Sequence, residues 1–132
     1  MDWNLNDLYP NINSKKISED FLKLEKRSIK FNKSFKNKIK NKSNPKIVHK
    51  AIVELEKIYE GLGKLSSYAS LNFAANTNNE KISQFYQSTS EKVSQIRKNL
   101  IFFFIDWNNI DSKNAKRISD TKILLKYKNL LE

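Results

Sequence analysis

The sequence predicts an all-α fold: an antiparallel bundle of three long helices, with shorter C-terminal helices and an extended N-terminal arm. Apolar residues recur in alternating steps of three and four through three long segments, which is the spacing that holds one helix face against a partner. Two Gly and two Pro in 132 residues are too few for a β fold built from many tight turns. The absence of Cys excludes a disulfide scaffold. We therefore expect a single helical domain.

The chain begins with an arm, residues 1–13, and then a first helix over residues 15–41. Pro10 disfavours helix at Tyr9, and the large apolar side chains of the arm are expected to lie against the bundle. Ser14 is the expected N-cap. The apolar stripe of the first helix consists of Ile17, Phe21, Leu24, Ser28, Phe31, Phe35 and Ile39.

The central helix of the bundle is expected over residues 45–75, after the N-cap Asn44 and with proline at its first position. Its main stripe is Val48, Ile52, Leu55, Tyr59, Leu62, Ser66, Ala69 and Phe73, and a second stripe of Ala51, Ile58 and Leu65 widens the face. Residues 68–75 are apolar or small on almost every side, which predicts burial all round. Gly61 and Gly63 mark either the close approach of a neighbour or a bend.

A third helix is expected from a capping box, formed by Thr77 and Glu80, to Trp107. Its stripe is Ile82, Tyr86, Thr89, Val93, Ile96, Leu100, Phe103 and Trp107. The apolar run at residues 100–105 resembles a buried strand when taken alone, but the heptad phase continues through it, so we interpret it as helix. Six apolar residues are far fewer than the roughly 20 that a membrane span needs.

The C-terminal part is expected to hold a short helix capped by Asp111 or Ser112, and then an amphipathic helix from Asp120. The apolar side of that last helix consists of Ile123, Leu124, Tyr127, Leu130 and Leu131. No Gly, Asn or Pro closes it before Glu132. We therefore expect the chain to be truncated at this end. The first residues lack the pattern of a signal peptide, so a cytoplasmic location is expected.

The excess of positive charge is concentrated between residues 15 and 50. The net charge is +11, and residues 15–50 carry 13 Lys or Arg against three acids. Nucleic-acid readers add Arg for bidentate contacts or aromatic side chains for stacking. Here Lys dominates, and Phe31 and Phe35 lie on the core stripe. We therefore interpret the lysines as a solvated helix face and expect only weak, sequence-independent binding of nucleic acid.

No catalytic, cofactor-binding or metal-ligating residue can be assigned from the sequence. His49 is the sole histidine, and a zinc site without Cys needs several His or carboxylate ligands that converge. A serine nucleophile would need His49 oriented by an acid. Glu54, Glu56 and Glu60 fit helix-surface charges better than an acid pair.

Three stretches of the sequence carry motifs of a known family. They read Trp3-x-Leu5-x-Asp7-Leu8-Tyr9-Pro10, then Tyr59-Glu60-x-Leu62-Gly63-x-Leu65-x-Ser67-Tyr68-Ala69-x-Leu71 with Ala75-Asn76-Thr77, then Phe102-Phe103-Phe104-Ile105 with Leu124-x-x-Tyr127-Lys128-x-x-Leu131-Glu132. In this order they span essentially the whole chain and resemble the N-terminal region of oligoendopeptidase F enzymes, which are thimet-like zinc peptidases. The resemblance implies that residues 1–132 are the N-terminal helical domain of such a protein, without its catalytic domain.

The resemblance also implies a role and partners. In that family the helical domain packs over the catalytic domain and helps to close a channel in which short peptides are cleaved. The partners would be the catalytic domain and, indirectly, peptide substrates. The family's zinc motif, His-Glu-x-x-His, has no counterpart here, so zinc is expected in the missing catalytic domain and this chain alone should be inactive. Two alternatives stay open: a basic helical bundle that binds nucleic acid, and a stand-alone helical interaction module that self-associates.

Overall fold

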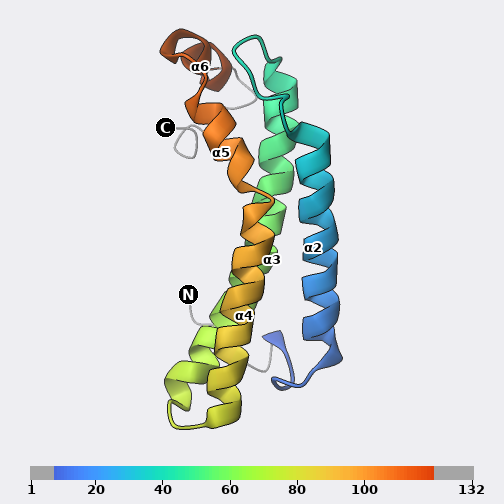
Figure 1. The fold of residues 1–132 in the computed structure, drawn as a ribbon, viewed down its shortest axis with the longest axis vertical. Coiled ribbons are helices and arrows are strands. Elements are labelled where there is room, and N and C mark those ends of the chain that lie inside the picture. The colour runs from blue at the N-terminus through green and yellow to red at the C-terminus, as the bar shows by residue number, and fades with distance from the viewer. Residues whose placement is uncertain (1–7, 121–132) are drawn as a thin grey trace.

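The computed structural model describes residues 8–120. Within them the chain forms helices and no strand, which confirms the all-α prediction. The helices are α2 (Lys15–Phe35), α3 (Pro45–Ala75), α4 (Glu80–Lys98), α5 (Ile101–Asn108) and α6 (Ser112–Ser119). α2, α3 and α4 lie lengthwise against one another and successive helices run in opposite directions, while α5 continues along the course of α4 (Figure 1). None of these helices is both long enough and apolar enough to cross a membrane.

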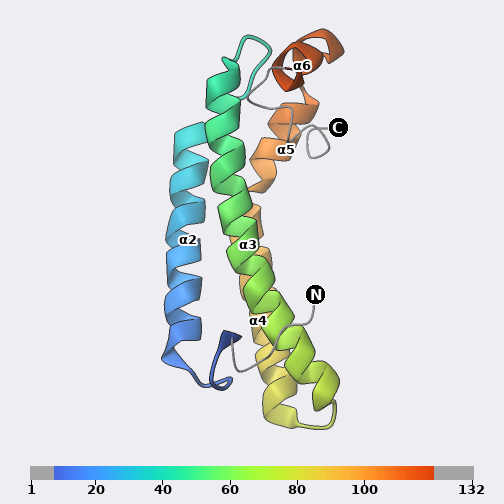
Figure 2. The same ribbon diagram turned by 180° about the vertical axis from the view of Figure 1, so that it is seen from behind.

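α3 is the central helix, as expected, and packs against α2, α4 and α6. Figure 2 shows it in front, with α2 beside it along most of its length. Both predicted stripes are buried through the middle of the helix. The main stripe contributes Val48, Ile52, Leu55, Leu62 and Ala69, and the second stripe contributes Ala51, Ile58 and Leu65.

The end of α3 departs from the prediction of burial all round. Leu71 is 38% exposed, and Ala74 and Ala75 are exposed as well. The tip of the α3–α4 hairpin extends past the start of α2, so α4 is the one described helix that lies beside it (Figures 1 and 2). The ring of Phe73 stacks on Tyr86 at 4.9 Å between centroids and holds the two helices together there.

The first helix was expected to reach residue 41, but α2 ends at Phe35. The backbone turns left-handed at Asn37, where φ is 66°, a conformation that Asn tolerates better than most residues. Ile39 lies beyond the helix and is still only 3% exposed. The apolar stripe therefore continues after the helix has stopped, because the loop folds back over the core.

The third helix was expected to be unbroken, but it divides into α4 and α5 at Asn99 and Leu100. The amide of Leu100 donates to the carbonyl of Arg97 at 2.9 Å, and that of Phe103 donates to Leu100 at 3.1 Å, both over three residues and not four. The torsion angles at the junction stay right-handed helical. The heptad phase therefore survives the break, and its members stay buried: Thr89, Val93, Ile96, Leu100, Phe103 and Trp107.

Of the four helix starts predicted from the sequence before Asp120, three are confirmed and one is wrong. The side chains of Ser14, Asn44 and Asp111 cap α2, α3 and α6. The expected capping box of Thr77 and Glu80 is wrong, because α4 is capped by Asn79, whose Oδ1 accepts from the amide of Ile82 at 3.2 Å. An Asn immediately before the helix satisfies that amide without help from Thr77.

The arm is described from Leu8 onward. Residues 1–7 and residues 121–132, which hold all but the first residue of the amphipathic helix expected from Asp120, lie outside the described residues. Leu8 and Tyr9 are buried, as predicted for an arm packed on the bundle. Residues 11–14 are not extended: the amide of the last donates to the carbonyl of the first at 3.1 Å and forms a turn into α2.

Candidate functional site

The described helices do not assemble a metal site. Residues 8–120 contain no group of three or more His, Cys, Asp or Glu side chains that could hold a metal ion. His49 is half-buried on α3. Glu54 is bonded to Arg27 of α2. These residues do not fit the zinc site of a peptidase, and we derive no chemistry through zinc from them.

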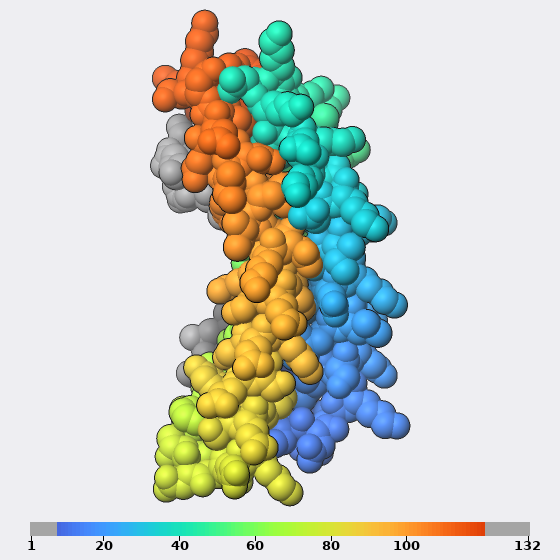
Figure 3. All heavy atoms as spheres, in the orientation of Figure 1, coloured from blue at the N-terminus to red at the C-terminus, as the bar shows by residue number. Residues whose placement is uncertain are grey.

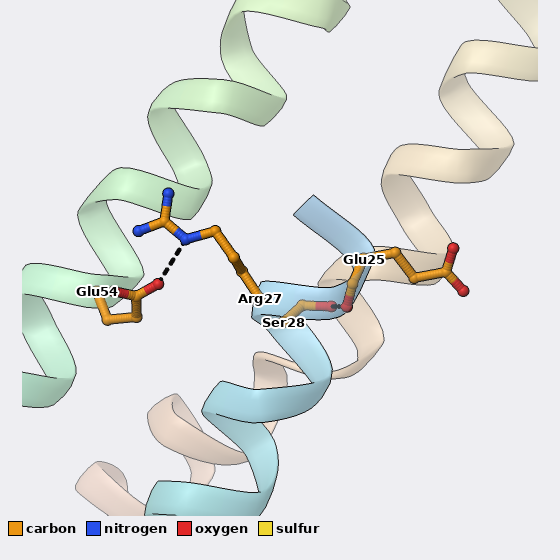
Figure 4. A network of polar contacts seen from close by, with 4 residues as sticks. All are labelled: Glu25, Arg27, Ser28 and Glu54. Carbon is orange, nitrogen blue, oxygen red and sulfur yellow. Dashed lines mark hydrogen bonds and ion pairs between the residues drawn. The ribbon is translucent and has the colours of Figure 1, made fainter. Parts of the chain in front are cut away.

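One surface feature is a groove between α2 and α3, which we call the α2–α3 groove. Arg27 reaches across it from α2, and its Nε lies 2.8 Å from Oε1 of Glu54 on α3 (Figure 4). The two side chains are 42% and 32% exposed, so we expect this ion pair to contribute only about 0–1 kcal/mol. The pair divides the groove into a lower and an upper pocket.

The lower pocket has a volume of about 450 Å³. Its floor includes Leu24 and Gly61, where the two helices approach closely: a Cβ at Gly61 would lie 2.6 Å from Cδ2 of Leu24. Close approach therefore explains Gly61. A Cβ at Gly63 would have no neighbour within 4 Å, so close approach does not explain that glycine. The cations that line the lower pocket are Lys23, Lys26, Arg27, Lys57 and Lys64.

Tyr9 closes the lower end of the groove. It is 1% exposed, and its hydroxyl donates to Oδ2 of Asp20 at 2.5 Å. Its ring packs edge-on against Tyr68 at 5.0 Å, and Nζ of Lys64 lies 5.0 Å from its centroid. Burial, and then the bond to the Asp20 carboxylate, raise the pKa of Tyr9 well above its usual value. The hydroxyl therefore keeps its proton, and Asp20 is held by it.

The upper pocket has a volume of about 400 Å³. Its cations are Arg27, Lys30 and Lys50, and its aromatic lining is Phe31 and Phe35, whose centroids are 5.2 Å apart. Across both pockets, seven different cations face two carboxylates, Asp20 and Glu54. The groove is therefore strongly positive, with apolar side chains along its floor.

Sequence reasoning treated the lysines of the first helix, Lys30 among them, as a solvated face, did not connect them with Lys57 and Lys64, and missed the groove. A signal was present in their spacing. Lys23 and Lys30 are seven residues apart on α2, and Lys50, Lys57 and Lys64 are seven apart on α3. A seven-residue repeat keeps a side chain on one edge of a helix–helix seam. The two rows therefore line the same seam from opposite sides.

A second surface consists of exposed apolar side chains on α5. Ile101 is 48% exposed and Ile105 is 54% exposed, four residues apart and therefore on one face of the helix. Their neighbours Phe102 and Phe103 are buried. Figure 3 shows α5 (orange) beyond the end of α4, on the same side of the molecule on which α4 and α2 meet. We call Ile101 and Ile105 the α5 face.

Comparison with known proteins identifies no relative: no protein-family model, no curated protein and no solved structure matches this chain.

Proposed function

We propose that this chain is the non-catalytic N-terminal helical domain of an oligoendopeptidase F-like zinc peptidase, in which it shapes and restricts access to a peptide-cleaving channel. The observation that carries the proposal is the resemblance of three sequence stretches in the family's order. In this proposal the bundle docks on the missing catalytic domain, which holds the zinc and cleaves oligopeptides, and the protein acts in the cytoplasm.

Part of the resemblance is carried by core positions. Leu62, Leu65 and Tyr68 are at most 2% exposed, and Phe102 and Phe103 are also buried. These buried matches support a shared scaffold, not shared chemistry. This agrees with a domain that forms a wall and contributes no catalytic residue.

The α5 face supports the docking step. Two exposed isoleucines on one helix face are suited to burial against another protein surface, because each gains about 1–2 kcal/mol when its exposed area is removed from water. The amphipathic helix expected from Asp120, which follows α6 in the sequence, offers a second apolar face for the same docking step.

The test is to determine the coding sequence that follows Glu132 and to express the continued reading frame. An in-frame His-Glu-x-x-His motif, together with chelator-sensitive cleavage of a short fluorogenic peptide, would support the proposal. A frame that stops at once, or that continues without the motif, would overturn it. The continued frame can then be compared with its Ile101→Asp/Ile105→Asp variant on a short peptide and on an unfolded protein. If the domain controls access, the variant should admit the unfolded protein before it loses the short peptide.

A further inference from the structure

Two rows of lysine face each other across the α2–α3 groove. Lys23 and Lys30 form one row, and Lys50, Lys57 and Lys64 form the other. In most paired helices, the positions that flank the seam carry opposite charges, which attract across it. Here both flanks are positive. Like charges that face each other raise the free energy of the surface, and an acidic partner would lower it.

The carboxylates in the groove do not neutralise these rows. Glu54 is held by Arg27 at 2.8 Å, and Asp20 accepts from the hydroxyl of Tyr9. Seven cations against two carboxylates leave a net charge of +5 along the two pockets. The charge complement of this surface is therefore a strongly acidic ligand.

The floor of the groove is apolar, so a ligand that fits it also needs apolar groups. Leu24 lies in the lower pocket and Phe31 in the upper pocket, seven residues further along α2. At 1.5 Å per residue the two pockets are about 10 Å apart along the helix axis. Apolar side chains seven residues apart on a partner helix have the same separation and point in the same direction.

We propose that the α2–α3 groove binds an acidic amphipathic helix from another protein. Apolar side chains of that helix, seven residues apart, fill the two pockets, and carboxylates on its flanks pair with the lysine rows. This is the helix-in-groove mode of peptide recognition. The inference does not depend on the role proposed above.

Two other occupants fit the groove less well. A second copy of this chain carries a net charge of +11, so it does not supply the acidic side chains that this positive groove would attract. A nucleic acid supplies phosphates but no aliphatic side chains for the two pockets. The single Arg of the groove is tied to Glu54. Of the two aromatic side chains in the groove, Phe31 is 1% exposed and Phe35 is half-buried, so the groove offers little open ring surface for a base to stack on.

The experiment measures binding of a fluorescein-labelled helical peptide of about 20 residues, long enough to hold helix in water. The first probe carries Leu at alternating steps of three and four and Glu on the flanks. The second replaces every Leu by Gln, and the third is an oligodeoxythymidylate of equal charge. The test variant is Lys30→Glu/Lys57→Glu, with one exposed lysine from each pocket. The matched control is Lys81→Glu/Lys98→Glu, which makes the same charge change at exposed positions of α4 outside the groove.

We expect the Leu-containing peptide to bind at least about tenfold tighter than the Gln peptide, because filling two apolar pockets is worth that factor or more. The groove variant should lose about tenfold or more of this affinity, and the control variant about twofold or less. Circular dichroism confirms that both variants keep their helix content. Equal losses in the two variants, equal binding of the Leu and Gln peptides, tighter binding of the oligonucleotide, or no binding of the Leu peptide would each overturn the proposal.

Discussion

The side-chain amide of Asn32 donates a hydrogen bond to the backbone carbonyl of Asn99 at 3.1 Å and so ties α2 to the junction of α4 and α5. In an unbroken helix that carbonyl would accept from the amide of Phe103, but this amide donates to Leu100 instead. Asn99 in turn donates its side-chain amide to Oγ of Ser28 at 3.0 Å, and Ser28 is fully buried. The polar groups exposed by the helix break are therefore satisfied by α2.

Removal of the Asn32 amide should destabilise the protein. We expect Asn32→Ala to lower the free energy of unfolding by about 1 kcal/mol, because the Asn99 carbonyl loses its donor in a partly buried place. Urea unfolding followed by circular dichroism measures the change. Lys33→Ala, at the exposed neighbouring position, is the control and should stay within about 0.5 kcal/mol of the parent. An Asn32 variant as stable as the control would show that α2 does not hold the junction through this bond.

The two glycines of α3 should respond differently to alanine. Gly63→Ala meets no atom within 4 Å, so the gain in helix propensity should appear in full, as about 0.5–1 kcal/mol of added stability. Gly61→Ala places its Cβ 2.6 Å from Cδ2 of the buried Leu24, which must shift. We expect this variant to be at least about 1 kcal/mol less stable than Gly63→Ala. Equal stabilities in urea unfolding would mean that α2 and α3 do not approach closely at Gly61.

Tyr9 should make stability fall in alkaline solution. Its pKa is raised in the folded protein, by burial and by the bond to Asp20, above the unfolded value of 10.0. The folded state therefore holds this proton more tightly than the unfolded state. The resulting stabilisation is complete below pH 10 and is lost as pH rises above that value.

Tyr9→Phe isolates this effect. The variant should lose about 1–2 kcal/mol near neutral pH, because the hydroxyl bond to the Asp20 carboxylate is gone. Its stability should then fall less steeply between pH 9 and pH 11 than that of the parent, because unfolding of the variant releases about one proton less. Urea unfolding at several pH values measures both slopes. Tyr59 and Tyr68, whose pKa values burial also raises, contribute to both proteins, so the comparison removes their share. Identical slopes would contradict a proton held by Tyr9.

Most of the fold could be predicted from local sequence signals. The N-caps at Ser14 and Asn44, and the stripes of α2 and α3, follow from side-chain chemistry and helical spacing. The end of α2 could not be predicted in this way, because Ile39 keeps the apolar spacing although the backbone has already turned at Asn37. The apolar periodicity shows which side chains are buried, but it does not show where the backbone hydrogen bonds of the helix end.

The break at Asn99 has the same origin. The torsion angles at the junction remain helical, so every apolar residue keeps its place and the sequence pattern is unchanged. The signal is instead the match between Asn99 and the polar residues Ser28 and Asn32 on another helix. Such a match depends on how helices far apart in sequence are placed side by side. The α2–α3 groove also depends on how helices are placed side by side, because the two lysine rows form a groove only when they face each other.

The α5 face should control self-association of the isolated chain. Ile101 and Ile105 lie four residues apart on α5, and each exposes about half of its surface. In the absence of a partner, burial between two copies is the available way to remove this area from water. We expect light scattering to show a mass that rises with protein concentration.

Ile101→Glu/Ile105→Glu should reduce that rise and should leave the free energy of unfolding within about 1 kcal/mol of the parent, since neither side chain is part of the core. The matched control is Leu22→Glu/Leu71→Glu, which alters exposed apolar residues on α2 and α3 instead. If association runs through the α5 face, the control should keep the concentration dependence. If the control abolishes association and the α5 variant does not, another apolar surface is responsible. The prediction that Ile101 and Ile105 drive self-association would then be wrong, and their proposed docking role would rest on the peptide-cleavage comparison alone.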